Sequence, residues 1–206
     1  NVIDQIISNQ DRFDLILAWH KDILEKCPKS KLFVFGTCWI DDDFVAEKKN
    51  EISFLTSNKN FAPGHKLRHK IYDYLANFTE INGFSIRNVM TPPRIPNKDV
   101  IFKNAKFSII VENAIHDNWI TEKLIDCFAT RTIPIYCGCP NVSSFFNDSG
   151  ILKFNNIFEL KSVLKTLTKD TYSNLEEAME DNYARSLEYG DFHERVKKEV
   201  KKIFQK

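Results

Sequence analysis

The polar residues best suited to chemistry gather in one short segment, residues 112–124, which reads ENAIHDNWITEKL. The segment lies between a strand-sized apolar run and a helical pattern, where open α/β sheets bind their ligands. Free backbone amides at the start of a helix that begins after Thr121 suit a phosphate group. Lys123 falls in the first turn of that helix, where a cation opposes the helix dipole. The segment therefore indicates an anionic ligand; the structural alternative is a capped helix with Lys123 in water.

A parallel sheet is needed to position these residues, and the surrounding sequence predicts one. Residues 106–111 (KFSIIV) form the continuous apolar run of a strand that is buried on both faces. Thr121 is a good N-cap, and an apolar stripe at helical spacing follows it. Residues 133–137 (IPIYC) form the next strand. A strand, a helix and a second strand in this order predict a crossover between parallel strands.

The same alternation runs through most of the chain, which predicts an α/β fold with a Rossmann-like parallel sheet flanked by helices. Further strands are expected at residues 14–18, 31–35, 51–56, 84–90 and 151–154. Further helices are expected at residues 19–26 and 64–78 and, with breaks near residues 170 and 190, from 157 to 206. A domain boundary is expected at residues 48–50, because the part before it looks too small for a complete domain.

The composition excludes several classes of protein. A net charge of +1 gives no electrostatic basis for binding nucleic acid or an anionic membrane. The longest apolar runs are strand-sized, so we expect no membrane segment, and the sequence opens on no secretory signal. Five cysteines, an odd number, predict reduced and mostly buried thiols, and the spacing of Cys137 and Cys139 fits no metal or redox motif. Reduced thiols and the missing signal favour a cytoplasmic location.

The segment from residue 107 to residue 138 resembles the donor-binding motif of glycosyltransferase family 10, the α-1,3/4-fucosyltransferases. The matching positions are Phe107, Glu112 and Asn113, then Trp119-Ile120-Thr121-Glu122-Lys123, then Ile133-Pro134-Ile135 and Gly138. A second match lies upstream, at Ile52-Ser53-Phe54, Ser57-Asn58-Lys59 and Arg68. The resemblance covers residues 51–167, whereas residues 14–40 resemble only the end of the family's N-terminal half.

The resemblance implies a donor lobe of the GT-B type with a truncated N-terminal portion. Residues 49–206 would be the GDP-sugar-binding domain with C-terminal helices, and residues 1–48 a remnant or reduced acceptor-side portion. The implied reaction is the inverting transfer of L-fucose from GDP-fucose to a hydroxyl of an acceptor glycan, as in α-1,3-fucosyltransferases. The expected partners are therefore GDP-fucose and that glycan. The resemblance implies no required metal or other cofactor, although a divalent cation can stimulate transfer.

Four of the matched residues are expected to hold charged and hydroxyl groups of the donor. The resemblance assigns Arg68 and Lys123 to the pyrophosphate, where cations stabilise the departing GDP. Thr121 adds a hydrogen bond, and Glu122 is the candidate for contact with the fucose or ribose hydroxyls. For Arg68, the alternative is a surface arginine on an amphipathic helix.

Three further matched residues are expected to shape the nucleotide pocket, namely Glu112, Asn113 and Trp119. Trp119 stands where the family has tyrosine, and we expect its ring to pack against the nucleotide. Two alternatives stay open here: Glu112 as a cap of the turn after its strand, and Trp119 as a core anchor.

The general base that takes the acceptor proton is not identified by the sequence. In the family this carboxylate lies in the N-terminal lobe, and Asp14, Asp22 and Asp41–Asp43 are candidates by residue type alone. The triplet at 41–43 also resembles the Asp-x-Asp metal motif of GT-A glycosyltransferases. Three alternative functions stay open: a nucleotide-sugar-binding module without transfer, an interaction domain, and a transferase for another nucleotide sugar. If an N-terminal anchor has been removed, the Golgi lumen is the alternative location.

Overall fold

The computed structural model describes residues 1–41, 44–91 and 99–204. Its main sheet has the strand order β4-β5-β3-β6-β7-β8. These strands are β3 (Lys49–Ser57), β4 (Glu80–Ile81), β5 (Phe84–Thr91), β6 (Ala105–Val111), β7 (Ile133–Cys137) and β8 (Leu152–Lys153). Every neighbouring pair from β5 to β8 is parallel, and only the short edge strand β4 runs antiparallel to its neighbour. The predicted α/β fold with a parallel sheet is confirmed.

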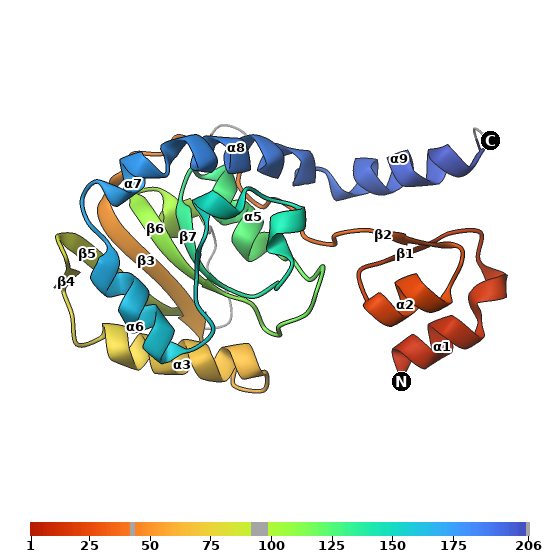
Figure 1. Cartoon of the computed structure of the whole chain (residues 1–206), viewed down its shortest axis with the longest axis horizontal. Coiled ribbons are helices and arrows are strands. Elements are labelled where there is room, and N and C mark those ends of the chain that lie inside the picture. Colours follow the sequence, from red (N-terminus) through yellow and green to blue (C-terminus); the bar gives the residue numbers. More distant parts are fainter. Residues whose placement is uncertain (42–43, 92–98, 205–206) are drawn as a thin grey trace.

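Helices cover both faces of this sheet (Figure 1). On one face lie α3 (Pro63–Leu75) and α6 (Ile157–Thr166), and on the other lie α4 (Asp99–Phe102) and α5 (Glu122–Ala129). The first face buries side chains of β3, β6 and β7 against α3 and α6, among them Ile52, Phe54, Phe107, Ile71, Leu75, Leu160 and Leu164. The second face packs Ile110 and Tyr136 against Leu124, Ile125 and Phe128 of α5. Because both faces are buried, β6 and β7 are continuously apolar, as the sequence predicted.

Three helices follow α6 along the chain: α7 (Thr171–Asn174), α8 (Glu176–Ser186) and α9 (Phe192–Phe204). Helix α8 packs on α5, and α9 projects beyond the sheet (Figure 1). The expected breaks near residues 170 and 190 are confirmed. No helix in the described ranges is both long and apolar enough to cross a membrane.

The N-terminal residues build a small separate unit. It contains α1 (Val2–Ser8), β1 (Ile16–Ala18), α2 (Lys21–Lys26) and β2 (Ser30–Leu32), and β1 pairs with β2 in parallel. The segment after β2 runs along the start of α9, where Arg195 donates to the carbonyl oxygens of Val34 at 2.6 Å and Gly36 at 2.8 Å. The assignment of residues 1–48 and 49–206 to different tasks stays a prediction.

Most elements lie close to the positions expected from the sequence, with two kinds of difference. The strand expected at 31–35 ends at Leu32, and the carbonyls of Val34 and Gly36 beyond it accept hydrogen bonds from Arg195. Helices α1 and α4 and strand β4 were not expected. None of the five cysteines forms a disulfide with a described residue, and four of them are buried, which confirms the predicted thiols. The expected irregular connection with Pro92, Pro93 and Pro96 lies outside the described residues.

Candidate ligand-binding site

A cavity of about 980 Å³ opens at the carboxyl edge of the sheet. Its walls include the last residues of β3, β5 and β6, which are Ser57, Thr91 and Val111, and the first turn of α5. In the sheet, β5 lies on one side of β3 and β6 lies on the other. The chain therefore builds the sheet in one direction from β3 to β5 and in the opposite direction from β6 to β8. Doubly wound sheets bind their ligands in the crevice that forms at such a reversal.

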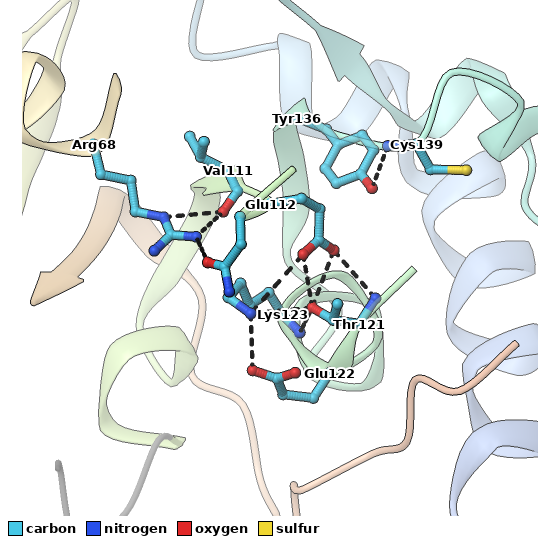
Figure 2. Close-up of polar contacts among 9 residues, drawn as sticks. Arg68, Val111, Glu112, Thr121, Glu122, Lys123, Tyr136 and Cys139 are labelled. Carbon is cyan, nitrogen blue, oxygen red and sulfur yellow. Dashed lines mark hydrogen bonds and ion pairs between the residues drawn. The ribbon is translucent and has the colours of Figure 1, made fainter. Parts of the chain in front are cut away.

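Arg68 reaches this cavity from α3. It belongs to the inward stripe of the helix, with Gly64, Ile71 and Leu75, and is only 7% exposed. Its Nε and Nη2 donate to the Val111 carbonyl oxygen at 3.0 and 2.7 Å, as Figure 2 shows. Burial lowers the pKa of the guanidinium, which still remains charged at neutral pH. The surface-arginine alternative for Arg68 is therefore wrong: a buried cation lines the cavity.

Asn113 completes the contacts of this arginine. Nη2 of Arg68 donates to Oδ1 of Asn113 at 2.6 Å, and both side chains line the cavity. Nη1 of Arg68 makes no hydrogen bond to any residue in the described ranges. Its two N–H groups are therefore available to an anion.

Glu112 lies directly behind the start of α5 and is fully buried. Its carboxylate accepts from the Thr121 hydroxyl at 2.8 and 3.1 Å and from the Thr121 backbone amide at 3.2 Å (Figure 2). Burial raises the pKa of Glu112, whereas the charge of Lys123 and the bonds from Thr121 lower it. Glu112 therefore holds the N-cap residue of α5 in position.

Thr121 is the N-cap that the sequence predicted, and Lys123 lies beside it. The Thr121 side chain accepts from the Lys123 amide at 3.4 Å. Nζ of Lys123 lies 3.1 Å from Oε1 of Glu122 and 3.9 Å from Oε2 of Glu112, and the side chain is 27% exposed. The alternative of Lys123 in water is wrong, because two carboxylates face it at the rim of the cavity (Figure 2).

Trp119 takes part both in the cavity wall and in packing. It lines the cavity, and its ring centroid lies 4.6 Å from that of Trp19, just before α2. Its Nε1 is buried and has no hydrogen-bond partner within the described part of the chain. The geometry is compatible with both expectations for Trp119, a ligand contact and an anchor.

Two glycines allow the close packing behind the site. A Cβ on Gly64 would lie 1.9 Å from the Glu112 carbonyl oxygen, so the start of α3 presses directly on the end of β6. A Cβ on Gly138 would lie 2.3 Å from Oη of Tyr136 and 2.6 Å from Cγ of Glu112. Figure 2 shows Tyr136 beside Glu112, where its hydroxyl accepts from the Cys139 amide at 2.9 Å. These contacts fix the distance between Arg68 and Glu112.

Several residues of the cavity wall were not assigned to the site from the sequence, among them Trp39, His65 and Asp126. Asp126 is completely buried, and its Oδ1 accepts from the Trp39 amide at 2.7 Å. A signal was present for Asp126, because it follows Glu122 by four residues on one helix face. Trp39 gave no such signal, since its position depends on contacts far along the chain.

The structure does not bring the described candidate bases, Asp14, Asp22 and Asp41, to the cavity. Asp14 and Asp41 are exposed. Asp42 and Asp43 lie outside the described residues. The carboxylates of the described wall are those of Glu122 and Asp126.

Comparison with known proteins gives a consistent set of relatives. The family profile "Glycosyltransferase family 10 (fucosyltransferase) C-term" matches residues 45–177. An α-(1,3)-fucosyltransferase from Helicobacter pylori is 33% identical over 60% of this chain and 24% of its own length. The 4-galactosyl-N-acetylglucosaminide 3-α-L-fucosyltransferase 9 of Rattus norvegicus is 29% identical over 77% of this chain and 44% of its own length. The chain thus spans less than half of these relatives.

Solved structures of α1,3-fucosyltransferases are also similar to this chain. A crystal structure of an α1,3-fucosyltransferase with GDP-fucose aligns with 68% of this chain and 49% of its own, at 26% identity and a TM-score of 0.47.

Proposed function

Because the chain belongs to glycosyltransferase family 10, we propose that it binds GDP-fucose and transfers L-fucose, with inversion, to a hydroxyl of an acceptor glycan. One observation supports this most directly. Arg68 from α3 and Lys123 from α5 approach the same cavity from the two faces of the sheet, at its carboxyl edge. Two cations in this position suit a diphosphate between them.

The diphosphate is the group whose charge changes during transfer. When the bond from fucose to the β-phosphate breaks, negative charge develops on the departing GDP. Arg68 and Lys123 stabilise that charge, and they do so without reorganisation because Val111, Asn113 and Glu122 already hold them. This is the chemistry that two preorganised cations can supply.

The remaining residues support the donor in different ways. Glu112 and Thr121 fix the N-terminal turn of α5 and with it the position of Lys123 at the cavity. Glu122, at the rim, is suited to accept hydrogen bonds from sugar or ribose hydroxyls. Trp119 offers a ring to the nucleotide. The two cations take the place that a metal ion would otherwise fill, so we propose that transfer requires no metal.

A binding module without transfer is the second candidate. It is favoured by one observation: none of the described aspartates proposed as the base lines the cavity.

Five cysteines that form no disulfide with a described residue fit a reducing compartment, for which we propose the cytoplasm.

The test is turnover of GDP-fucose with N-acetyllactosamine as acceptor, measured as released GDP and as fucosylated product. The transferase predicts release that rises with acceptor concentration and falls in Glu122→Gln or Asp126→Asn if either carboxylate is the base. Binding of GDP-fucose without release would assign the chain to the second candidate. Absence of binding would refute both.

A further inference from the structure

His65 is a buried histidine at the cavity that the proposed roles leave unused. It lies in the first turn of α3, three residues before Arg68, and is 3% exposed. Residues three apart share a helix face, and both His65 and Arg68 line the cavity. The exposed ring of Phe61 packs edge-on against the imidazole, with centroids 4.5 Å apart. The imidazole therefore has a fixed place in the cavity wall.

The hydrogen bonds of His65 define which nitrogen carries the proton. Nδ1 accepts from the Ala62 amide at 3.2 Å and so caps the start of α3. A neutral imidazole that accepts at Nδ1 carries its hydrogen on Nε2. Nε2 makes no hydrogen bond to any residue in the described ranges and is not fully buried, so it can reach a molecule in the cavity. This N–H donor is therefore available to a ligand that accepts hydrogen bonds.

The charges around His65 indicate what kind of acceptor. Arg68 and His69 on the same helix, Lys59 on the preceding loop and Lys123 on α5 all act on it. These groups and burial lower the pKa of His65, which keeps the imidazole neutral. The carboxylates of Glu112 and Glu122 already face Lys123. An N–H donor next to Arg68 in this surplus of positive charge suits an anionic oxygen.

We propose that His65 donates a hydrogen bond from Nε2 to the diphosphate of the bound nucleotide, beside Arg68. The proposal rests on the proposed donor function and adds a ligand contact to it. In this arrangement one face of α3 supplies two groups to the same diphosphate. A histidine fixed at Nδ1 by its own helix needs no rearrangement to make that bond.

Two substitutions separate the two nitrogens of His65. His65→Asn keeps an acceptor near the Nδ1 position, so it preserves the helix cap and removes the donor at Nε2. His65→Gln keeps an N–H donor near the Nε2 position and weakens the cap. His69→Asn is the matched control, because His69 lies one turn further along α3, does not line the cavity, and bonds the Lys59 carbonyl.

The measurement is calorimetric titration of the whole chain with GDP, inorganic pyrophosphate and guanosine, together with the melting temperature of each variant. We expect His65→Asn to lower the affinity for GDP and for pyrophosphate about tenfold and to leave the affinity for guanosine unchanged. The melting temperature of this variant should equal that of the wild type. His65→Gln should keep most of the affinity but melt at a lower temperature. His69→Asn should match the wild type.

The outcomes also separate this proposal from the proposed function. Wild-type chain that binds neither GDP nor pyrophosphate would overturn both. Wild-type chain that binds GDP, with His65→Asn binding equally well, would overturn only the assignment of His65. An equal loss of affinity for guanosine and for pyrophosphate in His65→Asn would also overturn the assignment of His65. Such a loss would come from a change in the structure of the cavity and not from a lost bond to the diphosphate.

Discussion

Replacing Arg68 separates the cost of burying a cation from its use in binding. Arg68 is 7% exposed and forms hydrogen bonds to the Val111 carbonyl and to Asn113 rather than an ion pair with a described carboxylate. Arg68→Met removes a buried charge, which favours folding, and leaves two acceptors without a donor, which opposes it. Because these effects have opposite sign, we expect the free energy of unfolding without ligand to change by less than about 2 kcal/mol.

The affinity for GDP should change far more than the free energy of unfolding. A hydrogen bond to a charged group contributes about 1.5–3 kcal/mol, so loss of Arg68 should weaken GDP binding about 10- to 150-fold. At a GDP concentration 100 times the wild-type Kd, the ligand stabilises the wild type by about 2.7 kcal/mol. A variant with 100-fold weaker binding gains only about 0.4 kcal/mol at that concentration. For a chain of this size, this corresponds to a shift in melting temperature of about 5–10 °C against 1–2 °C.

Thermal unfolding with and without GDP measures both quantities in one experiment. Arg87→Met is the matched control, because Arg87 lies on β5 of the same sheet, pairs with Glu51 at 2.9 Å and does not line the cavity. Arg68→Lys tests geometry, since lysine keeps the charge but cannot bind Val111, Asn113 and a phosphate at once. An equal GDP-induced shift in Arg68→Met, Arg87→Met and the wild type would refute the assignment of Arg68 to the diphosphate.

Three further predictions concern packing, pH and metal. Gly64→Ala should lower the free energy of unfolding in urea by more than about 2 kcal/mol, because its Cβ would lie 1.9 Å from a backbone oxygen. Gly190→Ala is the control and should be tolerated, since the nearest atom to its Cβ would lie 3.5 Å away. Tolerance of both substitutions would contradict the close packing of α3. Lys48 is half-buried, and desolvation lowers its pKa to about 7. In the unfolded chain Lys48 keeps its proton up to the ordinary lysine pKa, so the free energy of unfolding should rise with pH between these two values. Relative to Lys48→Met, the rise from pH 7 to pH 9 should be about 2 kcal/mol, and parallel pH profiles of the two proteins would disprove a lowered pKa. Fucose transfer should persist in EDTA, and activity that is lost in EDTA and restored by Mg²⁺ or Mn²⁺ would show that the two cations do not suffice.

The sequence predicted the site where local pattern determines structure. The apolar run at 106–111, the Thr121 cap and the helical stripe after it are local signals, and all three are in place. Arg68 was predicted only through the family resemblance, although in the structure it falls on the stripe of Gly64, Ile71 and Leu75. An arginine inside a buried stripe needs either a partner or a ligand.

Other parts of the site depend on contacts between distant segments. Glu112 and Thr121 are nine residues apart, and only the turn between them brings the hydroxyl to 2.8 Å from the carboxylate. The segment that carries Trp39 crosses α5 because Thr37 bonds to the carbonyls of Tyr189 and Gly190, more than 150 residues away. Local sequence patterns contain no information about contacts between residues so far apart in the chain. The wall of the cavity that carries Trp39 could therefore not be predicted.

Donor binding can be measured by titration of the chain with GDP-fucose, in parallel with a UDP-sugar. We expect saturable binding of GDP-fucose at one site, tighter than that of the UDP-sugar and strongly weakened in both Arg68→Met and Lys123→Met. Failure of every nucleotide sugar to bind, or GDP-fucose binding that neither substitution changes, would contradict the proposed donor function.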